Sequence, residues 1–124
     1  MARILIAEDE EALCAMCARA LLSVGHEVET AADGSDALEL LRREGGRFDL
    51  LLTDIRMPIM DGIALSLAVA RDYPDLIILL MTGYADQRER ASGLDALIHD
   101  VIQKPFTLAG LRATVEEALT VTAR

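Results

Sequence analysis

The chain has 124 residues, which is enough for one domain with a substantial hydrophobic core. Its 12 basic and 21 acidic residues give a formal charge of −9 at pH 7. This balance argues against direct binding to nucleic acid or to an anionic membrane, since both need a basic face. The strongly apolar run LIILLM at 76–81 is too short to span a bilayer, and the acidic EDEE after the first apolar run does not fit a signal peptide. We therefore expect a soluble, cytoplasmic protein.

Short apolar runs alternate with helical patterns along the whole chain. In chain order, the predicted elements are a strand at 3–7, a helix at 10–24, a strand at 27–32, a helix at 33–44, a strand at 49–53, a helix at 63–72, a strand at 76–81, a weakly specified helix at 85–99, a strand at 100–103 and a helix at 107–120. Local signals mark the ends of several elements, with helix stops at Gly25, Gly45-Gly46 and Pro74 and N-caps at Asp33 and Thr107.

This alternation predicts an α/β fold. Near-continuous apolar strands are typical of a parallel sheet that helices cover on both faces. The strand at 27–32 alternates in polarity and suits an edge, whereas the strands at 3–7 and 49–53 suit the centre. The expected fold is a doubly wound five-stranded parallel sheet of order 2-1-3-4-5, whose topological switch point lies between the first and third strands. No linker or repeat is evident, so we expect residues 1–124 to form a single domain.

The two cysteines, Cys14 and Cys17, form a C-x-x-C pair that invites a redox or zinc interpretation. There is no second pair, and His26 and His99 are far away in sequence. At a spacing of three residues, both cysteines extend the apolar stripe of one helix. We predict that they are buried core residues, as free cysteines often are.

Polar residues follow the ends of four predicted strands. The first strand is followed by Glu8 and Asp9, and the third by Asp54. The fourth strand is followed by Thr82, and the fifth by Lys104. The carboxyl ends of parallel strands meet at one edge, where doubly wound sheets bind ligands. Neighbouring strands lie about 4.8 Å apart, so Asp9 and Asp54 should face each other across the switch point within reach of one ion.

Each of these residues alone has an ordinary structural explanation, such as a turn-forming aspartate or a surface lysine. Their joint placement by four separate strands favours a functional site. Crowded carboxylates repel one another unless a cation joins them, and hard oxygen ligands in this number suit Mg²⁺. A carboxylate beside a metal, an ammonium group and a hydroxyl suits phosphoryl transfer, with Asp54 as the best candidate nucleophile.

The motifs AEDE, LLLTDIRMPIMDG, MTGY and QKPF, each at the end of a predicted strand, resemble the receiver domain of bacterial response regulators over essentially the whole chain. The resemblance implies a CheY-like (βα)5 fold of the flavodoxin type. It also implies a phosphoacceptor switch of a two-component system, which catalyses only its own phosphorylation and dephosphorylation and is not otherwise an enzyme. Asp54 would take its phosphoryl group from a phosphohistidine on a sensor histidine kinase or a histidine phosphotransferase.

The resemblance also assigns roles to the residues around Asp54. The implied Mg²⁺ ligands are Glu8, Asp9, Asp54 and the backbone carbonyl of Arg56. Thr82 would bond the phosphoryl group after transfer, and Lys104 would pair with it. A cis peptide bond before Pro105 would position the Lys104 ammonium group.

Two positions depart from the common pattern of the family. An aromatic switch residue is usual three positions before the lysine, and here that position is Val101. The first acid is Glu8, where aspartate is frequent. Tyr84 is a candidate substitute for the missing aromatic residue, and Arg56 and Tyr84 are expected to influence the lifetime of the acyl phosphate. Gly62 would shape the loop beside the acceptor, together with Met57-Pro58.

The family's signalling surface corresponds to residues of about 85–120 here, from the weakly specified helix to the last helix. A downstream protein target would bind this surface, and no output domain is expected in this chain. The alternatives are a phosphorelay shuttle, a receiver fragment of a longer regulator or hybrid kinase, and a receiver-like interaction module that never takes phosphate. A haloacid-dehalogenase-type phosphatase is disfavoured, because it needs a second aspartate where this chain has Arg56.

Overall fold

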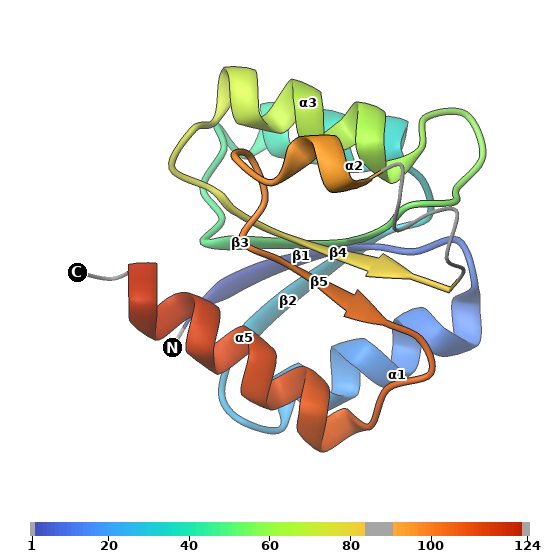
Figure 1. The fold of residues 1–124 in the computed structure, drawn as a ribbon, viewed down its shortest axis with the longest axis vertical. Helices are drawn as coiled ribbons and strands as arrows, with labels where there is room; N and C mark the ends of the chain where they lie inside the picture. Colours follow the sequence, from blue (N-terminus) through green and yellow to red (C-terminus); the bar gives the residue numbers. More distant parts are fainter. Residues whose placement is uncertain (1, 84–90, 123–124) are drawn as a thin grey trace.

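The computed structural model of the chain describes residues 2–83 and 91–122. In chain order, the elements are β1 (Arg3–Ala7), α1 (Glu11–Leu22), β2 (Glu27–Ala31), α2 (Gly34–Arg43), β3 (Leu50–Asp54), α3 (Gly62–Asp72), β4 (Ile77–Thr82), the 3₁₀-helix η1 (Ser92–Leu94), β5 (Asp100–Gln103) and α5 (Leu108–Thr122) (Figure 1). The strands form one parallel sheet in the order β2-β1-β3-β4-β5, as the sequence predicts.

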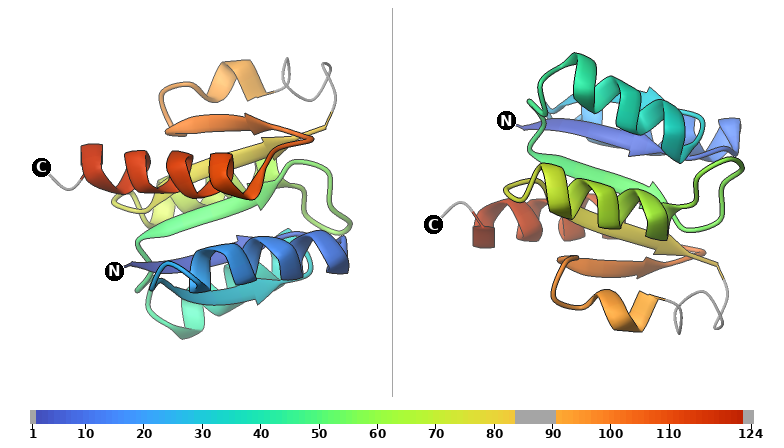
Figure 2. Two further views of the ribbon diagram at one scale, coloured as in Figure 1. Left: turned by 90° about the horizontal axis from the view of Figure 1, so that it is seen from below. Right: turned by 90° about the horizontal axis from the view of Figure 1, so that it is seen from above.

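Helices cover both faces of this sheet. Figures 1 and 2 show α1 and α5 side by side on one face, and α2 and α3 together on the other face. Each layer has its own hydrophobic core. On the α1–α5 side, Cys17 and Leu21 pack with Leu111 and Val115, and on the other side Leu38 and Leu41 pack with Leu65.

The three central strands are apolar on both faces because they contribute to both cores. In β1, Leu5 faces the α2–α3 side while Ile4 and Ile6 face the α1–α5 side. In β3 the same alternation places Leu51 on one side and Leu50 and Leu52 on the other. The uninterrupted apolar runs of the sequence therefore follow from a strand buried on two faces. The edge strand β2 is mostly exposed, in agreement with its polar alternation.

The predicted capping residues are confirmed at two helices. The Asp33 side chain accepts a hydrogen bond of 2.8 Å from the Asp36 amide at the start of α2. The Thr107 hydroxyl accepts one of 2.9 Å from the Gly110 amide at the start of α5. Such caps satisfy amides that have no partner within the helix.

The first part of the weakly specified helix predicted at 85–99 lies outside the described residues, which omit 84–90. Ala91 is helical and the short η1 follows it directly, whereas the described residues 95–99 are not helical. Gly93 lies in the middle of η1, and glycine is a poor helix former because it loses the most backbone entropy on folding.

Cys14 and Cys17 are free and buried, which confirms their predicted place in the core. Burial raises the pKa of both thiols, to about 11 for Cys17, so neither carries an activated thiolate at neutral pH. Among the described residues, none of the helices combines the length and the apolar character needed to cross a membrane.

Candidate functional site

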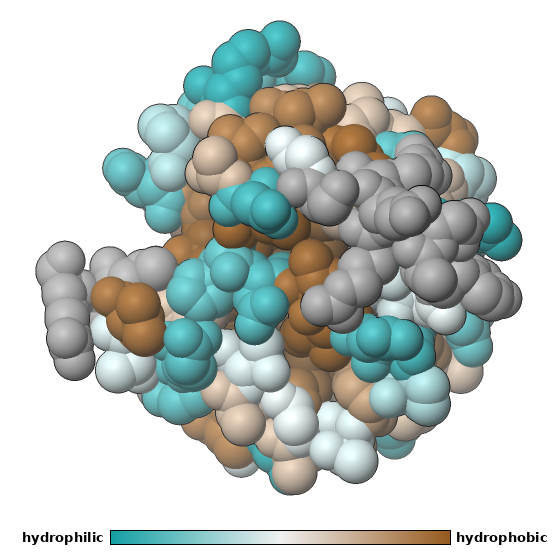
Figure 3. Space-filling model, viewed as in Figure 1, coloured by the Kyte–Doolittle hydropathy of each residue, from teal (hydrophilic) through white to brown (hydrophobic). Residues whose placement is uncertain are grey.

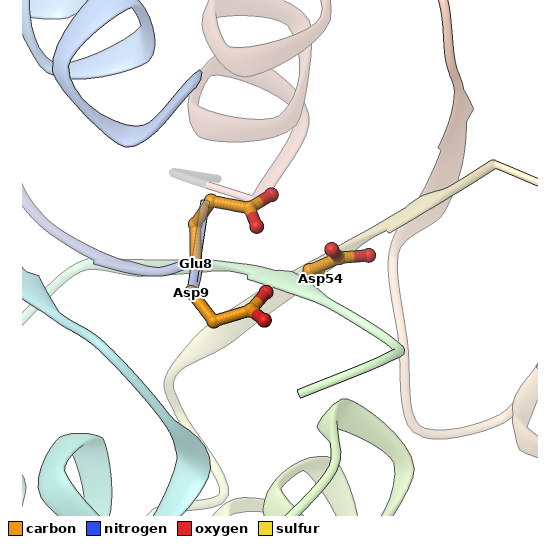
Figure 4. Close-up of side chains that lie close together, drawn as sticks. All are labelled: Glu8, Asp9 and Asp54. Atoms are coloured by element: carbon orange, nitrogen blue, oxygen red, sulfur yellow. The ribbon is translucent and has the colours of Figure 1, made fainter. Parts of the chain in front are cut away.

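The carboxyl ends of β1 and β3 bring three carboxylates together. Asp54 is the last residue of β3, and Glu8 and Asp9 directly follow β1. Each of the three offers an oxygen atom that lies within 4.8 Å of the others (Figure 4). The cause is the parallel pairing of the two strands, in which Ala7 lies opposite Thr53 and the residues that follow diverge from the same edge. The prediction that Asp9 and Asp54 face each other at the switch point is confirmed.

Lys104 joins this cluster from the end of β5. Its Nζ atom lies 2.9 Å from Asp54 Oδ2 and 3.2 Å from Glu8 Oε1. The Lys104 amide donates a 2.7 Å hydrogen bond to the Thr82 carbonyl, which ties the end of β5 to the end of β4. The ammonium group therefore bridges two acids that come from different strands, and charge-assisted bonds of this kind are stronger than neutral ones.

Both oxygen atoms of Asp54 are held in place. Its Oδ1 accepts a 2.8 Å hydrogen bond from the amide of Ile55, and its Oδ2 contacts Lys104. The residue as a whole is only 6% exposed. A carboxylate can therefore end the fully buried β3, because the strand fixes its backbone and local donors fix its side chain.

Burial changes the acidity of Glu8. Its side chain is buried, and desolvation raises its pKa from 4.5 to about 7. The nearby charge of Asp54 acts in the same direction, while the Glu10 amide and Lys104 oppose it. At neutral pH the Glu8 carboxyl is therefore partly protonated in the metal-free site, as expected for a buried acid beside another carboxylate.

The pKa of Lys104 is raised as well, which for a lysine favours the charged form. Burial alone lowers the pKa of its ammonium group, but the hydrogen bonds and charges of Asp54 and Glu8 outweigh this effect and raise it above 10.5. The lysine is therefore a permanent positive charge beside Asp54 over the ordinary pH range.

The cluster lies in an open pocket of about 450 Å³, lined by Glu8, Asp9, Glu10, Asp54, Arg56, Gly83, Lys104 and Pro105. Thr82 is buried at the end of β4, beside the pocket residue Gly83, and is not itself among the lining residues. Arg56 is exposed at the pocket wall. Sequence reasoning did not identify Glu10, whose amide donates a 3.0 Å hydrogen bond to Glu8, because a backbone donor leaves no signal in residue type.

Gly62 is required by a close approach of two backbone segments. Its amide donates a 2.8 Å hydrogen bond to the Ile55 carbonyl. A Cβ atom at this position would overlap the carbonyl oxygen of Asp54 and come within 3.0 Å of the Ile55 Cα. Glycine therefore lets α3 begin directly behind the acidic residue, which agrees with the expectation that Gly62 shapes this loop.

Two of the other predicted positions, Pro105 and Val101, lie within the described residues. The peptide bond between Lys104 and Pro105 is cis, as the resemblance implied. Val101 is half-buried and packs against the core on the α2–α3 side, which includes Leu94 and Ile98. Tyr84 lies outside the described residues.

Three carboxylates and an ammonium group thus meet at the switch point of a doubly wound parallel sheet, the place where such α/β domains bind ligands. Comparison with known proteins identifies the family. The family model of the response regulator receiver domain matches residues 4–116, and the chain belongs to this family.

The chain is similar to parts of longer curated proteins. The protein is 39% identical over 119 residues to the sensor kinase CckA of Brucella abortus, covering 95% of this chain and 12% of that protein. It is 38% identical over 117 residues to the response regulator MprA of Mycobacterium leprae, covering 94% and 50%. The chain thus spans about half the length of these relatives or less.

Solved structures of the family share the fold. A CheY-like receiver domain protein from Methanospirillum hungatei has a TM-score of 0.88 and 30% identity, with 98% of this chain and 95% of that one covered. The response regulator TrrA of Thermotoga maritima, solved in complex with Mg²⁺ and BeF, has a TM-score of 0.83 and 28% identity, with coverage of 96% and 100%. The predicted CheY-like fold and strand order are confirmed.

Proposed function

We propose that this receiver domain takes a phosphoryl group on Asp54 in an Mg²⁺-dependent reaction with a phosphohistidine of a partner kinase or phosphotransfer protein. The modified domain then presents an altered surface to a downstream protein. The observation that carries this proposal is the convergence on one pocket of Asp54, two further acids and the Lys104 ammonium group. No residue of the set serves a hydrophobic core, so an explanation by packing alone does not account for it.

The acidic cluster fits a divalent cation. Glu8, Asp9 and Asp54 are hard oxygen donors from two adjacent strands, and Asp9 is exposed to solvent. Sites with two or three carboxylates leave room for waters and phosphate oxygens, which is the preference of Mg²⁺. When bound, the ion supplies positive charge that offsets the repulsion between the carboxylates and the incoming phosphoryl oxygens.

In the proposed step, a carboxylate oxygen of Asp54 attacks the phosphorus atom of the phosphohistidine. An acyl phosphate bond forms, the P–N bond breaks, and the imidazole of the donor keeps the electron pair and takes up a proton. Lys104 is already within 2.9 Å of Asp54 and would shift its contact to a phosphoryl oxygen. Thr82 would donate its hydroxyl to another. Catalysis of this type relies on positioning and charge rather than on a general base.

The site has a direct connection to the proposed signalling surface. Lys104 directly follows β5 and is followed within four residues by α5, and its amide donates a hydrogen bond to the Thr82 carbonyl. A change in the contacts of Lys104 and Thr82 on phosphorylation would therefore act on the adjoining carboxyl ends of β4 and β5, and the chain continues from the end of β5 into α5. Figure 3 shows hydrophilic and hydrophobic residues interspersed over the coloured part of this face.

Intact-mass spectrometry after incubation with acetyl phosphate tests the chemistry. Wild type should gain one phosphoryl group with Mg²⁺ and none with EDTA, and Asp54→Asn should gain none. Asp75→Asn, at an exposed aspartate before β4, is the matched control and should behave as wild type. Beryllofluoride, a phosphoryl mimic, provides a second arm: if neither an adduct nor Mg²⁺-dependent beryllofluoride binding is found, the proposed function is wrong.

A further inference from the structure

The loop between β3 and α3 holds an isoleucine in an unfavourable position. Ile59 has a φ of +70°, and among the described residues it is the one non-glycine residue with positive φ. The Met60 amide donates a 2.7 Å hydrogen bond to the Pro58 carbonyl, so these residues form a three-residue γ-turn around Ile59. Positive φ is a genuine outlier for a β-branched residue, and this form of γ-turn is rare and strained.

The strain does not serve the hydrophobic core. The Ile59 residue is 85% exposed, more than any other large hydrophobic residue in the described part of the chain. Asparagine or glycine would adopt the same backbone at lower cost, and either would avoid exposing an apolar side chain. Residues held in strained backbone conformations cluster at functional sites. The strain at Ile59 therefore indicates a role for this side chain other than folding.

The loop is fixed at both its base and its side, so the side chain of Ile59 is presented from a rigid platform. At the base, the Gly62 amide donates to the Ile55 carbonyl at 2.8 Å. At the side, the Gly34 amide of α2 donates to the Met60 carbonyl at 3.1 Å, and a Cβ on Gly34 would overlap that same carbonyl oxygen.

The loop also forms part of the pocket rim. Its residue Arg56 lines the pocket that contains Asp54. In Figure 2 the segment between β3 and α3 projects beyond the end of the sheet toward which the strand arrows point. Asp54 is only 6% exposed, so a protein that delivers a phosphohistidine to it must place its surface over this rim. The reacting atoms must approach to about 3–3.5 Å, so the donor protein must contact the rim of the pocket during transfer.

We propose that Ile59 is an apolar docking contact for the phosphohistidine-bearing protein that phosphorylates Asp54, an inference that rests on the proposed function. The partner surface presents an apolar patch beside its phosphohistidine, into which Ile59 packs. The exposed acids Glu10 and Glu11 lie at the start of α1, and Glu10 also lines the pocket. Charge complementarity then calls for basic residues on the partner where it faces these acids.

Comparison of a protein donor with a small donor separates docking from acceptor chemistry. The small donor is acetyl phosphate. The protein donor is the one that labels wild type fastest in the complete set of purified, phosphohistidine-carrying kinases and phosphotransfer proteins of the source organism. Ile59→Asn removes the apolar side chain but tolerates positive φ, and Ile59→Leu keeps an apolar side chain. Leu22→Asn is the matched control, because Leu22 is 52% exposed at the end of α1 away from the pocket.

We expect Ile59→Asn to lower the second-order rate constant with the protein donor by about tenfold or more, the range of an interface anchor. Its rate with acetyl phosphate should stay within twofold of wild type. Ile59→Leu should retain most of the protein-donor rate, and Leu22→Asn should match wild type with both donors.

Three results would overturn the proposal. Ile59→Asn could react with the protein donor as fast as wild type does, or it could lose rate equally with both donors, which would place its effect on the acceptor loop. Labelling of wild type by acetyl phosphate but by no protein of the set would leave no partner for Ile59. Failure of wild type with acetyl phosphate as well is a different outcome, which contradicts the proposed function itself.

Discussion

Replacement of Glu8 by glutamine is expected to stabilise the metal-free protein at neutral pH and to remove part of its pH dependence. In the folded state, burial raises the pKa of the Glu8 carboxyl from 4.5 to about 7. A difference of this size, at 1.36 kcal/mol for each pH unit between 4.5 and about 7, corresponds to about 3 kcal/mol of unfolding free energy. The ionised Glu8 carboxylate thus lowers the unfolding free energy of the metal-free protein.

The sign follows from proton binding. Between pH 4.5 and about 7 the folded protein keeps a proton on Glu8 that the unfolded chain has released. Stability from this group is therefore fully present below pH 4.5 and is lost as the pH rises through about 7. Glu8→Gln and wild type should be similar at pH 5, and the variant should be more stable by about 3 kcal/mol at pH 8.

Urea unfolding followed by circular dichroism, in EDTA at pH values from 5 to 8, measures this difference. The exposed Glu39 on α2 provides the control variant Glu39→Gln, which should run parallel to wild type at every pH. If the free-energy difference between Glu8→Gln and wild type did not change with pH, the burial argument for Glu8 would be wrong.

Three further predictions concern the metal and the local geometry. Gly62→Ala should lower the unfolding free energy by about 1–3 kcal/mol, because the new Cβ overlaps the Asp54 carbonyl, whereas Gly93→Ala, with no neighbouring atom within 4 Å, should not; urea midpoints distinguish the two. Mg²⁺ at ten times its dissociation constant should stabilise wild type by about 1.4 kcal/mol in thermal melts at pH 8, and Asp9→Asn should lose most of that gain. Asp33→Ala should cost about 1 kcal/mol in urea unfolding through loss of the α2 cap, and an unchanged midpoint would contradict the assigned hydrogen bond.

The sheet order and the positions of the site acids could be predicted from the sequence because both depend on one periodicity. Uninterrupted apolar strands indicated a parallel sheet with two covered faces, and the carboxyl ends of its strands had to share an edge. That reasoning placed Asp54, Asp9 and Lys104 together, and the structure brings them there. The caps at Asp33 and Thr107 could also be predicted, because the side chains of these residue types accept hydrogen bonds from amides at the start of the following helix.

Other features depend on three-dimensional approach and leave no periodic signal. The contact between the Gly34 amide and the Met60 carbonyl joins segments that are distant in sequence. A glycine at the start of a helix is common in turns, so the sequence does not reveal this contact. The positive φ of Ile59 was also beyond prediction, because residue type alone argues against it. The raised pKa of Glu8 depends on how deeply its side chain is buried. The position of a residue directly after a strand does not determine that depth.

Location of the phosphoryl group is the measurement that tests the central claim most directly. The protein is treated with acetyl phosphate and Mg²⁺, the acyl phosphate is reduced with borohydride, and the modified residue is found by peptide mass mapping. The account predicts one modified residue, Asp54. Modification at Glu8, at Asp9 or at a histidine instead would contradict it.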